Sequence, residues 1–276
     1  MRAAARIPHM NTPLRTLTCA LAVASAVAAA PAAANPGMQQ VRGGPGASAT
    51  LRGGVLTMHW QGGSSRIHVP AGYALPVVTT RGELGGMSFN GRTVVLADRG
   101  GAGDGRSRFL VAEYGKVTPL TFRGRVAFDA IAPSGSAIYL TRHTSPTDPT
   151  RYVVLQYARG ERKLDQIGVK SVFSAQGAES PDWKMQGLPV ARATAADGTW
   201  TYTLYTAREY PFIHALPLGQ GPWAVCIELP ESWRARVATL SLRARPGQVV
   251  EVLNPSGTVV ATADVMHGKL QLAAGT

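Results

Sequence analysis

The chain has 276 residues, of which 45% are hydrophobic and 16% charged, so it is long enough to bury the core of one large domain. Lysine and arginine (28 residues) outnumber aspartate and glutamate (16), and the formal net charge is +12. No segment shows sustained helical periodicity, which excludes a helical bundle.

The first 34 residues predict a secretory signal peptide. Three arginines and no acid surround or precede the start of the apolar run Leu17–Ala30, and Ala32-Ala33-Ala34 stand before Asn35 in the small-residue pattern of a cleavage site. The apolar run is too short and too rich in alanine for a transmembrane helix. Met10 offers a second start for the same leader. We expect a secreted or cell-envelope protein without a transmembrane segment.

Cleavage would lower the net charge to +9, because the leader carries three arginines. A positive field favours an anionic partner, here an anionic cell-wall polymer or another envelope protein. The arginines are scattered singly through the sequence, without a dense run or a recognition-helix pattern, so we expect no nucleic-acid partner. Genome composition accounts equally well for the arginine content, and a merely basic surface is the competing interpretation. We expect a monomer.

The mature chain keeps one cysteine, Cys226, so no intramolecular disulfide can form. Cys226 lies in the alternating run Ala224–Leu229, where a cysteine usually serves as a small buried hydrophobe and not as a nucleophile. The fold is therefore expected to be stable without a covalent link.

The N-terminal part of the mature chain predicts a flexible segment followed by a hairpin. Residues 35–50 are rich in Gly, Ala and Pro, which is typical of a flexible lead-in, and the folded domain is expected over 51–276. Val55–Trp60 and Arg66–Val69 form the hairpin. This hairpin resembles the last half of a propeller blade, and we expect strands from both termini to complete one blade and so remove the open edge.

A four-strand rhythm then repeats four times. The expected strands of the first two cycles are Leu84–Ser88, Val94–Ala97, Phe109–Tyr114 and Val117–Phe122, then Val126–Ile131, Ala137–Thr141, Tyr152–Tyr157 and Leu164–Ile167. Those of the last two are Leu188–Thr194, Trp200–Tyr205, Phe212–Leu216 and Ala224–Leu229, then Ala238–Arg243, Val249–Leu253, Val259–Asp264 and Lys269–Leu272.

A glycine turn separates the first two strands of every cycle. The turn glycines Gly91, Gly135, Gly198 and Gly247 follow one another at intervals of 44, 63 and 49 residues. A period of about 40–50 residues with four short strands is typical of propeller blades. The sequence therefore predicts an all-β fold, a β-propeller of four or five four-stranded blades, and the N-terminal hairpin favours five.

Two longer connections interrupt the rhythm, Thr144–Thr150 and the polar segment Gly168–Met185, which is long enough for an exposed loop. Strand alternation is plain in Trp200–Tyr205, where threonines alternate with larger residues. We expect the threonines to face one side of the sheet and the larger residues the other.

Searches for catalytic motifs find no zinc-protease, nucleophile-elbow or phosphate-loop pattern. The glycine cluster Arg99–Gly105 lies between two expected strands, so it predicts a hairpin loop and not a dinucleotide site. Asp98 and Asp104 offer only two carboxylates for calcium. The segment Arg142–Asp148 holds the residue types of a hydrolase triad, but residues so close in a proline-rich loop seldom reach that geometry.

No cofactor is expected from the sequence. The histidines of the mature chain are well separated, and a metal site gathered from different blades has no direct support. Asp197-Gly198-Thr199-Trp200 is similar to the turn of sialidase Asp-boxes but lacks the residue between Asp and Gly.

Several segments resemble a group of uncharacterised secreted proteins of high-GC bacteria described as WD40-like or YVTN-like propellers. The shared segments are Phe128–Leu140, Asp148–Tyr152, Lys184–Gly187, Asp197–Tyr205, Pro211–Leu216 and Ala224–Pro230. The chain departs from the repeat at Ser134, where Asp is usual, and lacks the Trp-Asp and Gly-His pairs of true WD40 blades. The resemblance implies export and a propeller over about 84–272, and no particular activity.

Charged residues inside apolar strands suggest where a ligand could bind. Asp129 interrupts an apolar first strand and Arg151 heads a third strand, and buried charges require partners. Asp129, His143, Arg151 and His214 are therefore candidates for a polar ligand site at the mouth of the central channel. The competing interpretation is structural, with Arg151 paired to Asp129 or Asp148.

The sequence thus favours a secreted, non-catalytic binding module of the cell envelope, and we name no catalytic residue. The alternative is a propeller hydrolase or lactonase that acts on sugar derivatives with a metal in the channel.

Overall fold

The structure is a computed structural model that describes residues 37–175, 185–207 and 210–274. The predicted signal peptide and the Met10 start lie outside these residues. Within the described part, no helix is long and apolar enough to cross a membrane.

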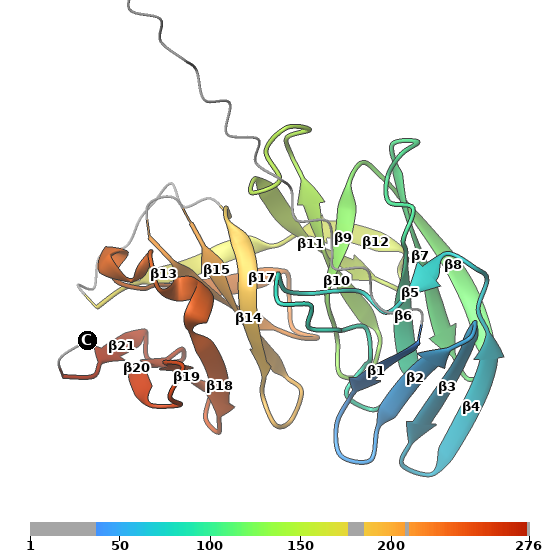
Figure 1. Cartoon of the computed structure of the whole chain (residues 1–276), viewed down its shortest axis with the longest axis horizontal. Helices are drawn as coiled ribbons and strands as arrows, with labels where there is room; N and C mark the ends of the chain where they lie inside the picture. Colours follow the sequence, from blue (N-terminus) through green and yellow to red (C-terminus); the bar gives the residue numbers. More distant parts are fainter. Residues whose placement is uncertain (1–36, 176–184, 208–209, 275–276) are drawn as a thin grey trace, which may run out of the picture. The chain divides into compact units, whose positions relative to one another are not determined.

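The chain folds into five sheets of consecutive strands, the blades of a five-bladed β-propeller (Figure 1). The first blade consists of β1 (Met38–Arg42), β2 (Ser48–Arg52), β3 (Val55–Trp60) and β4 (Gly63–His68). The second consists of β5 (Tyr73–Ala74), β6 (Thr93–Asp98), β7 (Arg106–Glu113) and β8 (Lys116–Arg123). The third consists of β9 (Val126–Ile131), β10 (Ala137–His143), β11 (Tyr152–Ala158) and β12 (Lys163–Gln166).

The fourth blade has five strands, of which the first in sequence lies at its edge. It consists of β13 (Gly168–Phe173), β14 (Leu188–Thr194), β15 (Trp200–Thr206), β16 (Phe212–Pro217) and β17 (Trp223–Glu228). The fifth blade follows two 3₁₀ turns, η1 (Glu231–Trp233) and η2 (Val237–Thr239). It consists of β18 (Ser241–Arg245), β19 (Val249–Leu253), β20 (Val259–Asp264) and β21 (Lys269–Leu272).

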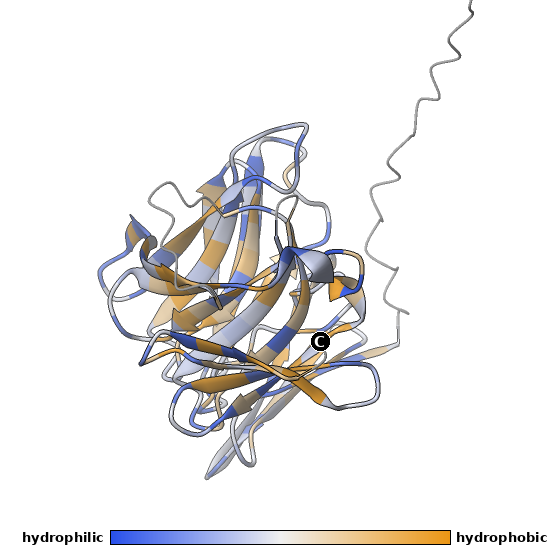
Figure 2. Ribbon diagram, turned by 90° about the vertical axis from the view of Figure 1, so that its left-hand side faces the viewer, coloured by the Kyte–Doolittle hydropathy of each residue, from blue (hydrophilic) through white to orange (hydrophobic). Residues whose placement is uncertain are grey.

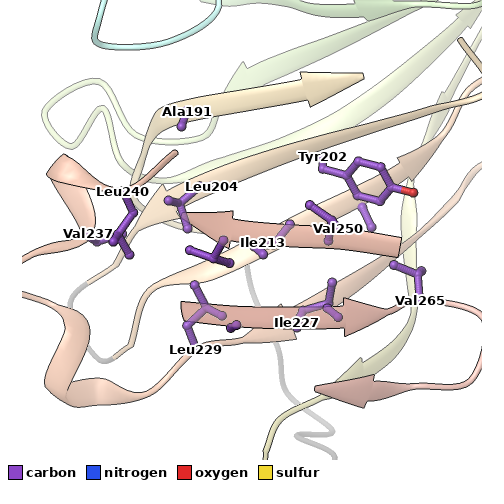
Figure 3. Close-up of a cluster of buried hydrophobic side chains, with 14 of the residues drawn as sticks. Ala191, Tyr202, Leu204, Ile213, Ile227, Leu229, Val237, Leu240, Val250 and Val265 are labelled. Carbon is purple, nitrogen blue, oxygen red and sulfur yellow. The ribbon is translucent and has the colours of Figure 1, made fainter. Parts of the chain in front are cut away.

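Four hydrophobic clusters join these blades in chain order, the first to the second, the second to the third, and so on to the fifth. Each cluster forms because successive side chains of a strand point to opposite faces of the sheet. The apolar residues of an inner strand therefore join two clusters, as Val94 and Val95 of β6 do, and Figure 2 shows the apolar bands along the strands. The cluster between the fourth and fifth blades is the one shown in Figure 3, where Val237 and Leu240 lie at one end and Tyr202 and Val265 at the other.

The predicted glycine turns are confirmed. Gly91, Gly135, Gly198 and Gly247 all have positive φ, at 74°, 81°, 73° and 76°. This left-handed conformation favours glycine. Gly135, Gly198 and Gly247 connect the first strand of their blade to the second, and Gly91 closes the turn that precedes β6. The predicted alternation of β15 is confirmed for Tyr202 and Leu204, which join the cluster with the fifth blade, but it is wrong for Tyr205, which lies on the side of the threonines and joins the cluster with the third.

The N-terminal strands differ from the expectation. The segment 35–50, expected to be a flexible lead-in, holds β1 and the start of β2, which pair in register from Met38↔Arg52 to Arg42↔Ser48. The glycines between them close the turn and gave the segment the composition of a linker. The first blade therefore takes all its strands from residues 38–68, and the prediction that both termini complete one blade is wrong.

The first strand of the second blade is also different. Leu84–Ser88 is not a strand: Leu84 and Met87 form only single bridges, to Val77 and Val94. The strand is instead the short β5, and the chain leaves the sheet after Ala74. The excursion reaches the fourth blade, where Thr80 N–H donates to the Pro189 carbonyl at 2.8 Å. Figure 1 shows it as a loop that leaves β5 and runs toward β14.

Two smaller differences lie near the fourth and fifth blades. The first part of the expected loop Gly168–Met185 is β13, which pairs parallel with β17, and residues 176–184 lie outside the described part. The expected strand Ala238–Arg243 begins only at Ser241, because η2 occupies the residues before it.

Candidate ligand-binding site in the central cavity

A cavity of about 750 Å³ lies among the inner strands of the first four blades. It is lined mainly from four stretches, 40–48, 84–89, 128–131 and 192–201. They belong to β1 and its turn, the bridge-forming segment before β6, β9, and β14 with the turn after it. The first and third blades thus contribute their first strands and the fourth blade contributes β14, as expected for the channel of a propeller, whereas the second blade contributes the segment before β6.

One end of this cavity is narrowed by Phe89. A Cβ atom on Gly44 would lie 2.7 Å from its ring, and one on Gly198 would lie 2.5 Å from it. The backbone of Gly44 also donates to the Phe89 carbonyl at 2.7 Å. Turns of the first and fourth blades therefore pack against Phe89, which precedes β6 of the second blade. Both contacts require glycine because a Cβ atom would clash with the ring.

The wall of the cavity holds a buried ion pair between the third and fourth blades. Asp129 on β9 is 4% exposed and Arg192 on β14 is 11% exposed. Arg192 donates from Nη2 to the Asp129 carboxylate and from Nη1 to the Asp129 backbone carbonyl. Both hydrogen bonds are charge-assisted, which strengthens them in a buried setting.

A β-bulge explains why Asp129 can make these contacts. In the pairing of β9 with β10, Ala130 lies opposite Tyr139 and Phe128 opposite Leu140, so Asp129 has no partner in the ladder. A bulge leaves its extra residue unpaired and redirects the side chain. The Asp129 carbonyl is thereby free of the sheet and accepts a hydrogen bond from the arginine.

Behind the ion pair, polar residues form one row across the fourth blade. Arg192 lies opposite Thr203, Thr203 opposite His214, and His214 opposite Cys226. Thr203, His214 and Cys226 are all buried. Burial lowers the pKa of His214 to about 4, which the nearby Asp129 carboxylate only partly opposes. The imidazole is therefore neutral at pH 7.

Two tyrosines and the cysteine complete this buried cluster. The rings of Tyr152 and Tyr205 lie 5.9 Å apart, and burial, with the Asp129 charge as a further cause, raises the pKa of both phenols. Burial likewise raises the pKa of the Cys226 thiol. All three side chains are thus protonated at neutral pH, and Cys226 has the reactivity of an ordinary buried thiol.

The cluster is incompletely hydrogen-bonded. Asp129 Oδ2 and Arg192 Nε are buried and have no hydrogen-bond partner among the described residues. Buried polar atoms usually find a partner in protein or in ordered water. The ion pair therefore has one acceptor and one donor left to satisfy.

The structure brings two of the four predicted site residues together and separates the others. Asp129 and His214 belong to the buried cluster. His143 lies at the end of β10, with its ring 6.2 Å from that of Tyr152 and its pKa lowered by burial. Arg151 is exposed before β11, and its backbone forms a bridge with Gln186. The partner of Asp129 is Arg192, not Arg151.

Sequence reasoning missed Arg192 because Leu188–Thr194 has the pattern of an ordinary half-exposed strand. One signal was present: Arg192 lies at the same distance from its glycine turn as Asp129 does from Gly135, six residues before it. Equivalent positions in neighbouring blades have equivalent places in a propeller. A pair of opposite charges at such positions predicts contact between inner strands.

The other sequence features have structural roles in the described part. Asp104 forms a salt bridge with Arg108, whose other guanidinium nitrogen lies 4.0 Å from Asp98, so an arginine occupies the place considered for calcium. Asp197 accepts hydrogen bonds from the Thr199 backbone and hydroxyl at 3.0 and 2.7 Å and so closes the turn. No group of three His, Cys, Asp or Glu side chains arranged for a metal occurs among the described residues.

The cavity lining contains both polar and apolar residues and is nearly balanced in charge. Its charged residues are Asp129 and Arg192, which neutralise each other, and Arg42 at the end of β1. Ser48, Thr194 and Thr201 add hydroxyl groups. Hydroxyls with a neutralised ion pair suit a ligand that binds by hydrogen bonds more than by charge.

No protein-family model matches the chain, and no match is found among curated proteins. Among solved structures, the chain is similar to TolB from Acinetobacter baumannii, with a TM-score of 0.42 and 9% identity over 84% of this chain and 56% of TolB. It is similar to oligopeptidase B from Trypanosoma brucei, with a TM-score of 0.44 and 9% identity over 85% of this chain and 33% of that one.

A third likeness is to the β-propeller domain of Cps50 (Swd1) from Myceliophteria thermophila, with a TM-score of 0.40 and 13% identity over 85% of this chain and 73% of that one. The chain thus spans about half of the first of these proteins and a third of the second. These likenesses do not identify a ligand or an activity. The resemblance to secreted propellers of high-GC bacteria stays a prediction.

Proposed function

We propose that this protein is a secreted, non-catalytic binding module of the cell envelope whose central cavity takes a hydroxyl-rich ligand such as an oligosaccharide. The observation that carries the proposal is the cavity of about 750 Å³ with the neutralised Asp129–Arg192 pair in its wall. This volume lies within the range of pockets for small ligands, about 300–1,000 Å³. Asp–Arg pairs and hydroxyls are suited to adjacent hydroxyl groups, which both donate and accept.

The residues around the cavity support binding more than chemistry. The buried histidine is neutral, the cysteine is a buried thiol, and the carboxylate is held by an arginine. An activated nucleophile would need an adjacent base within hydrogen-bond reach and access to substrate. Export and an anionic partner at the envelope complete the proposal, and they rest on the leader sequence and the net charge.

Filling the cavity tests the proposed site. Thr194 lines the cavity and is exposed to it, so Thr194→Trp should abolish binding of neutral N-acetylglucosamine oligomers in ligand-observed NMR. Thr121→Trp, at an exposed position on β8, is the matched control and should bind as the wild type does. Binding that survives Thr194→Trp would place the ligand elsewhere, and no binding by the wild type would reject this ligand class.

The proposed export and the competing enzyme are tested separately. Protein recovered from the medium or envelope should begin at Asn35, as measured by intact mass. The alternative, a metal-dependent hydrolase or lactonase, predicts a stoichiometric divalent metal in protein purified without chelators and turnover of sugar lactones that Asp129→Asn abolishes. Turnover by the wild type would overturn the non-catalytic proposal.

A further inference from the structure

Among the described residues, no hydrophobic cluster covers one face of the first blade, and this face carries an excess of positive charge. The residues that face the second blade are mostly apolar and buried, from Val41 on β1 to Ile67 on β4; Gln39 is a buried polar exception and accepts a hydrogen bond from the Leu75 backbone. The residues between them point to the opposite side and are exposed or half-buried. We call this opposite side the free face of the first blade.

The strand register places the members of the free face in three rows. The rows are Met38–Arg52–Val55–His68, then Gln40–Thr50–Thr57–Arg66, then Arg42–Ser48–His59–Ser64. Each row holds at least one arginine, and all three arginines are exposed. The positions between them are mostly hydroxyl or amide side chains, which hydrogen-bond without adding charge.

No carboxylate balances these cations. The sequence contains no aspartate or glutamate before Glu83, so the whole first blade lacks an acid. Arg42, Arg52 and Arg66 form no ion pair with any described residue. The sequence scatters these arginines singly, but the fold of the sheet places them on one face.

In the fifth blade, by contrast, outward-facing arginines are paired with an acid of the same blade. Its outward strand positions include Arg243 and Arg245, and both guanidinium groups bind Glu251, at 2.6 and 3.1 Å. Those cations are therefore neutralised within their own blade. Genome composition alone would supply arginines to both blades, but it does not explain why one blade also holds the acid that pairs them and the other holds none.

From this contrast we propose that the free face of the first blade binds a linear polymer that carries repeated phosphate groups. The arginine guanidinium matches phosphate with two parallel hydrogen bonds. Strands lie about 4.8 Å apart and alternate residues about 6.8 Å apart, so Arg52 and Arg66, two strands and one row apart, stand about 12 Å from each other. No two arginines converge on one small anion, whereas a chain of phosphates can reach several of them.

The same face argues against two other anionic partners. Nucleic acids bound without sequence preference use aromatic rings on which bases stack, and the aromatic residue of these strands, Trp60, packs with the cluster on the opposite side. A membrane surface usually takes up apolar side chains as well as charge, and Met38 is the one large hydrophobic residue of this blade that is strongly exposed. A phosphate polymer needs neither feature.

The inference deepens the anionic-partner part of the proposed function. The free face adjoins the cavity along its inner edge, where Gln40, Arg42 and Ser48 belong to both. Arg42 lies at the cavity rim, whereas Arg52 and Arg66 do not line the cavity. A polymer on the free face could therefore continue toward the cavity past Arg42. Variants of Arg52 and Arg66 test the face without altering the cavity.

The experiment measures binding of poly(glycerol phosphate) to the mature protein at 50 mM salt, with dextran as the uncharged control. Arg52→Gln/Arg66→Gln should weaken binding about fivefold, since exposed charge contacts are individually modest. Arg99→Gln/Arg123→Gln removes the same charge from exposed positions of the second blade and should change binding less than twofold. Thr194→Trp should leave binding to the face nearly unchanged.

Equal weakening by both double variants would overturn the proposal, because the net charge and not the face would then attract the polymer. Absence of binding at 50 mM salt, or equal binding to single-stranded DNA or to phosphatidylglycerol vesicles, would overturn it as well. Loss of oligosaccharide binding in Thr194→Trp with polymer binding intact would separate the cavity from the face. The two proposals can therefore fail independently.

Discussion

The first and fourth blades are both built from short antiparallel strands, but polar residues are mostly exposed in the first blade and mostly buried in β15 and β16 of the fourth. The fourth blade packs against a neighbour on both faces, and β15 and β16 are buried almost throughout. In the part of the chain that the structure describes, the first blade packs against the second blade alone, and its strands alternate between buried and exposed residues. The number of blades that a blade packs against thus decides whether its polar side chains are exposed to solvent or buried.

This difference has a consequence for each blade. Polar residues of the fourth blade such as Thr203 and His214 are buried, so they need hydrogen-bond partners inside the protein. Polar residues of the first blade face outward, so they cost little and are available to a partner. Equivalent substitutions in the two blades should therefore have very different effects.

The largest effect is expected at the buried ion pair. Arg192→Met should lower the free energy of unfolding by about 3–5 kcal/mol, because it leaves the buried Asp129 carboxylate without its cation. Urea denaturation followed by tryptophan fluorescence measures this change. Arg66→Met on the free face is the matched control and should stay within about 0.5 kcal/mol of the wild type.

The double variant Asp129→Leu/Arg192→Met sharpens this test. Removing both charges should recover most of the lost stability, since a buried pair contributes little net stability over apolar residues. If the double variant were as unstable as Arg192→Met alone, the cost would come from lost packing of the long arginine side chain and not from the unpaired charge.

The next effect concerns packing. Leu204 on β15 is fully buried in the cluster shown in Figure 3, and Leu204→Ala should cost about 3 kcal/mol through lost contacts and a residual cavity. Thr57→Ala, on the free face of the first blade, should change stability by less than about 0.5 kcal/mol. Similar costs at the two sites would contradict the difference between the blades.

A pH effect should follow from His214. Its pKa in the folded state is about 4, below the value of about 6.5 for an unfolded chain, so between these values the unfolded state binds more protons. Stability contributed by the neutral imidazole is therefore complete above pH 6.5 and is lost as pH falls toward 4. Between pH 6.5 and 5 the loss should be about 2 kcal/mol.

Urea denaturation at each pH measures this slope. His214→Asn should flatten it, whatever the variant's stability at pH 7. His143, whose pKa burial also lowers, contributes in the same direction, so a small slope should remain. His59→Asn on the first blade, where the ring is exposed, is the control, and a slope unchanged in His214→Asn would mean that His214 is not the group responsible.

The fold could be predicted from the sequence because local features repeat. Each glycine turn requires a positive φ, and side chains alternate between the two faces of the strands beside it. The turns at Gly135 and Gly198 therefore allowed most strands of the third and fourth blades to be placed correctly. The first strand of the second blade could not be predicted, because the chain leaves the sheet after β5. Its excursion is held by Pro189, over a hundred residues away, and such a contact has no local signal.

The candidate site, too, could be predicted only as far as local sequence patterns reach. Asp129 could be predicted, because a charge in an apolar strand requires a partner. The identity of that partner depends on the bulge at Asp129 and on the packing of β9 beside β14, and neither is encoded locally. The free face likewise became visible only when the register placed Arg42, Arg52 and Arg66 on one side of a sheet expected to be partly flexible.

The smallest effect distinguishes two glycine turns that the sequence makes equivalent. Gly198 and Gly247 have nearly the same φ, 73° and 76°, so alanine should cost about 1 kcal/mol at either through backbone strain. At Gly247 a Cβ atom meets nothing within 4 Å, whereas at Gly198 it would lie 2.5 Å from Phe89. Gly198→Ala should therefore cost about 1 kcal/mol more than Gly247→Ala.

The source of that difference can be isolated in a Phe89→Ala background, where the ring that Gly198 contacts is gone. There the two glycine substitutions should cost the same in urea denaturation, because only backbone strain is left. A difference that persists without Phe89 would show that the fourth-blade turn is constrained by something other than this ring. Because Gly198 also lines the cavity, the displaced Phe89 in Gly198→Ala should weaken oligosaccharide binding, which Gly247→Ala should not.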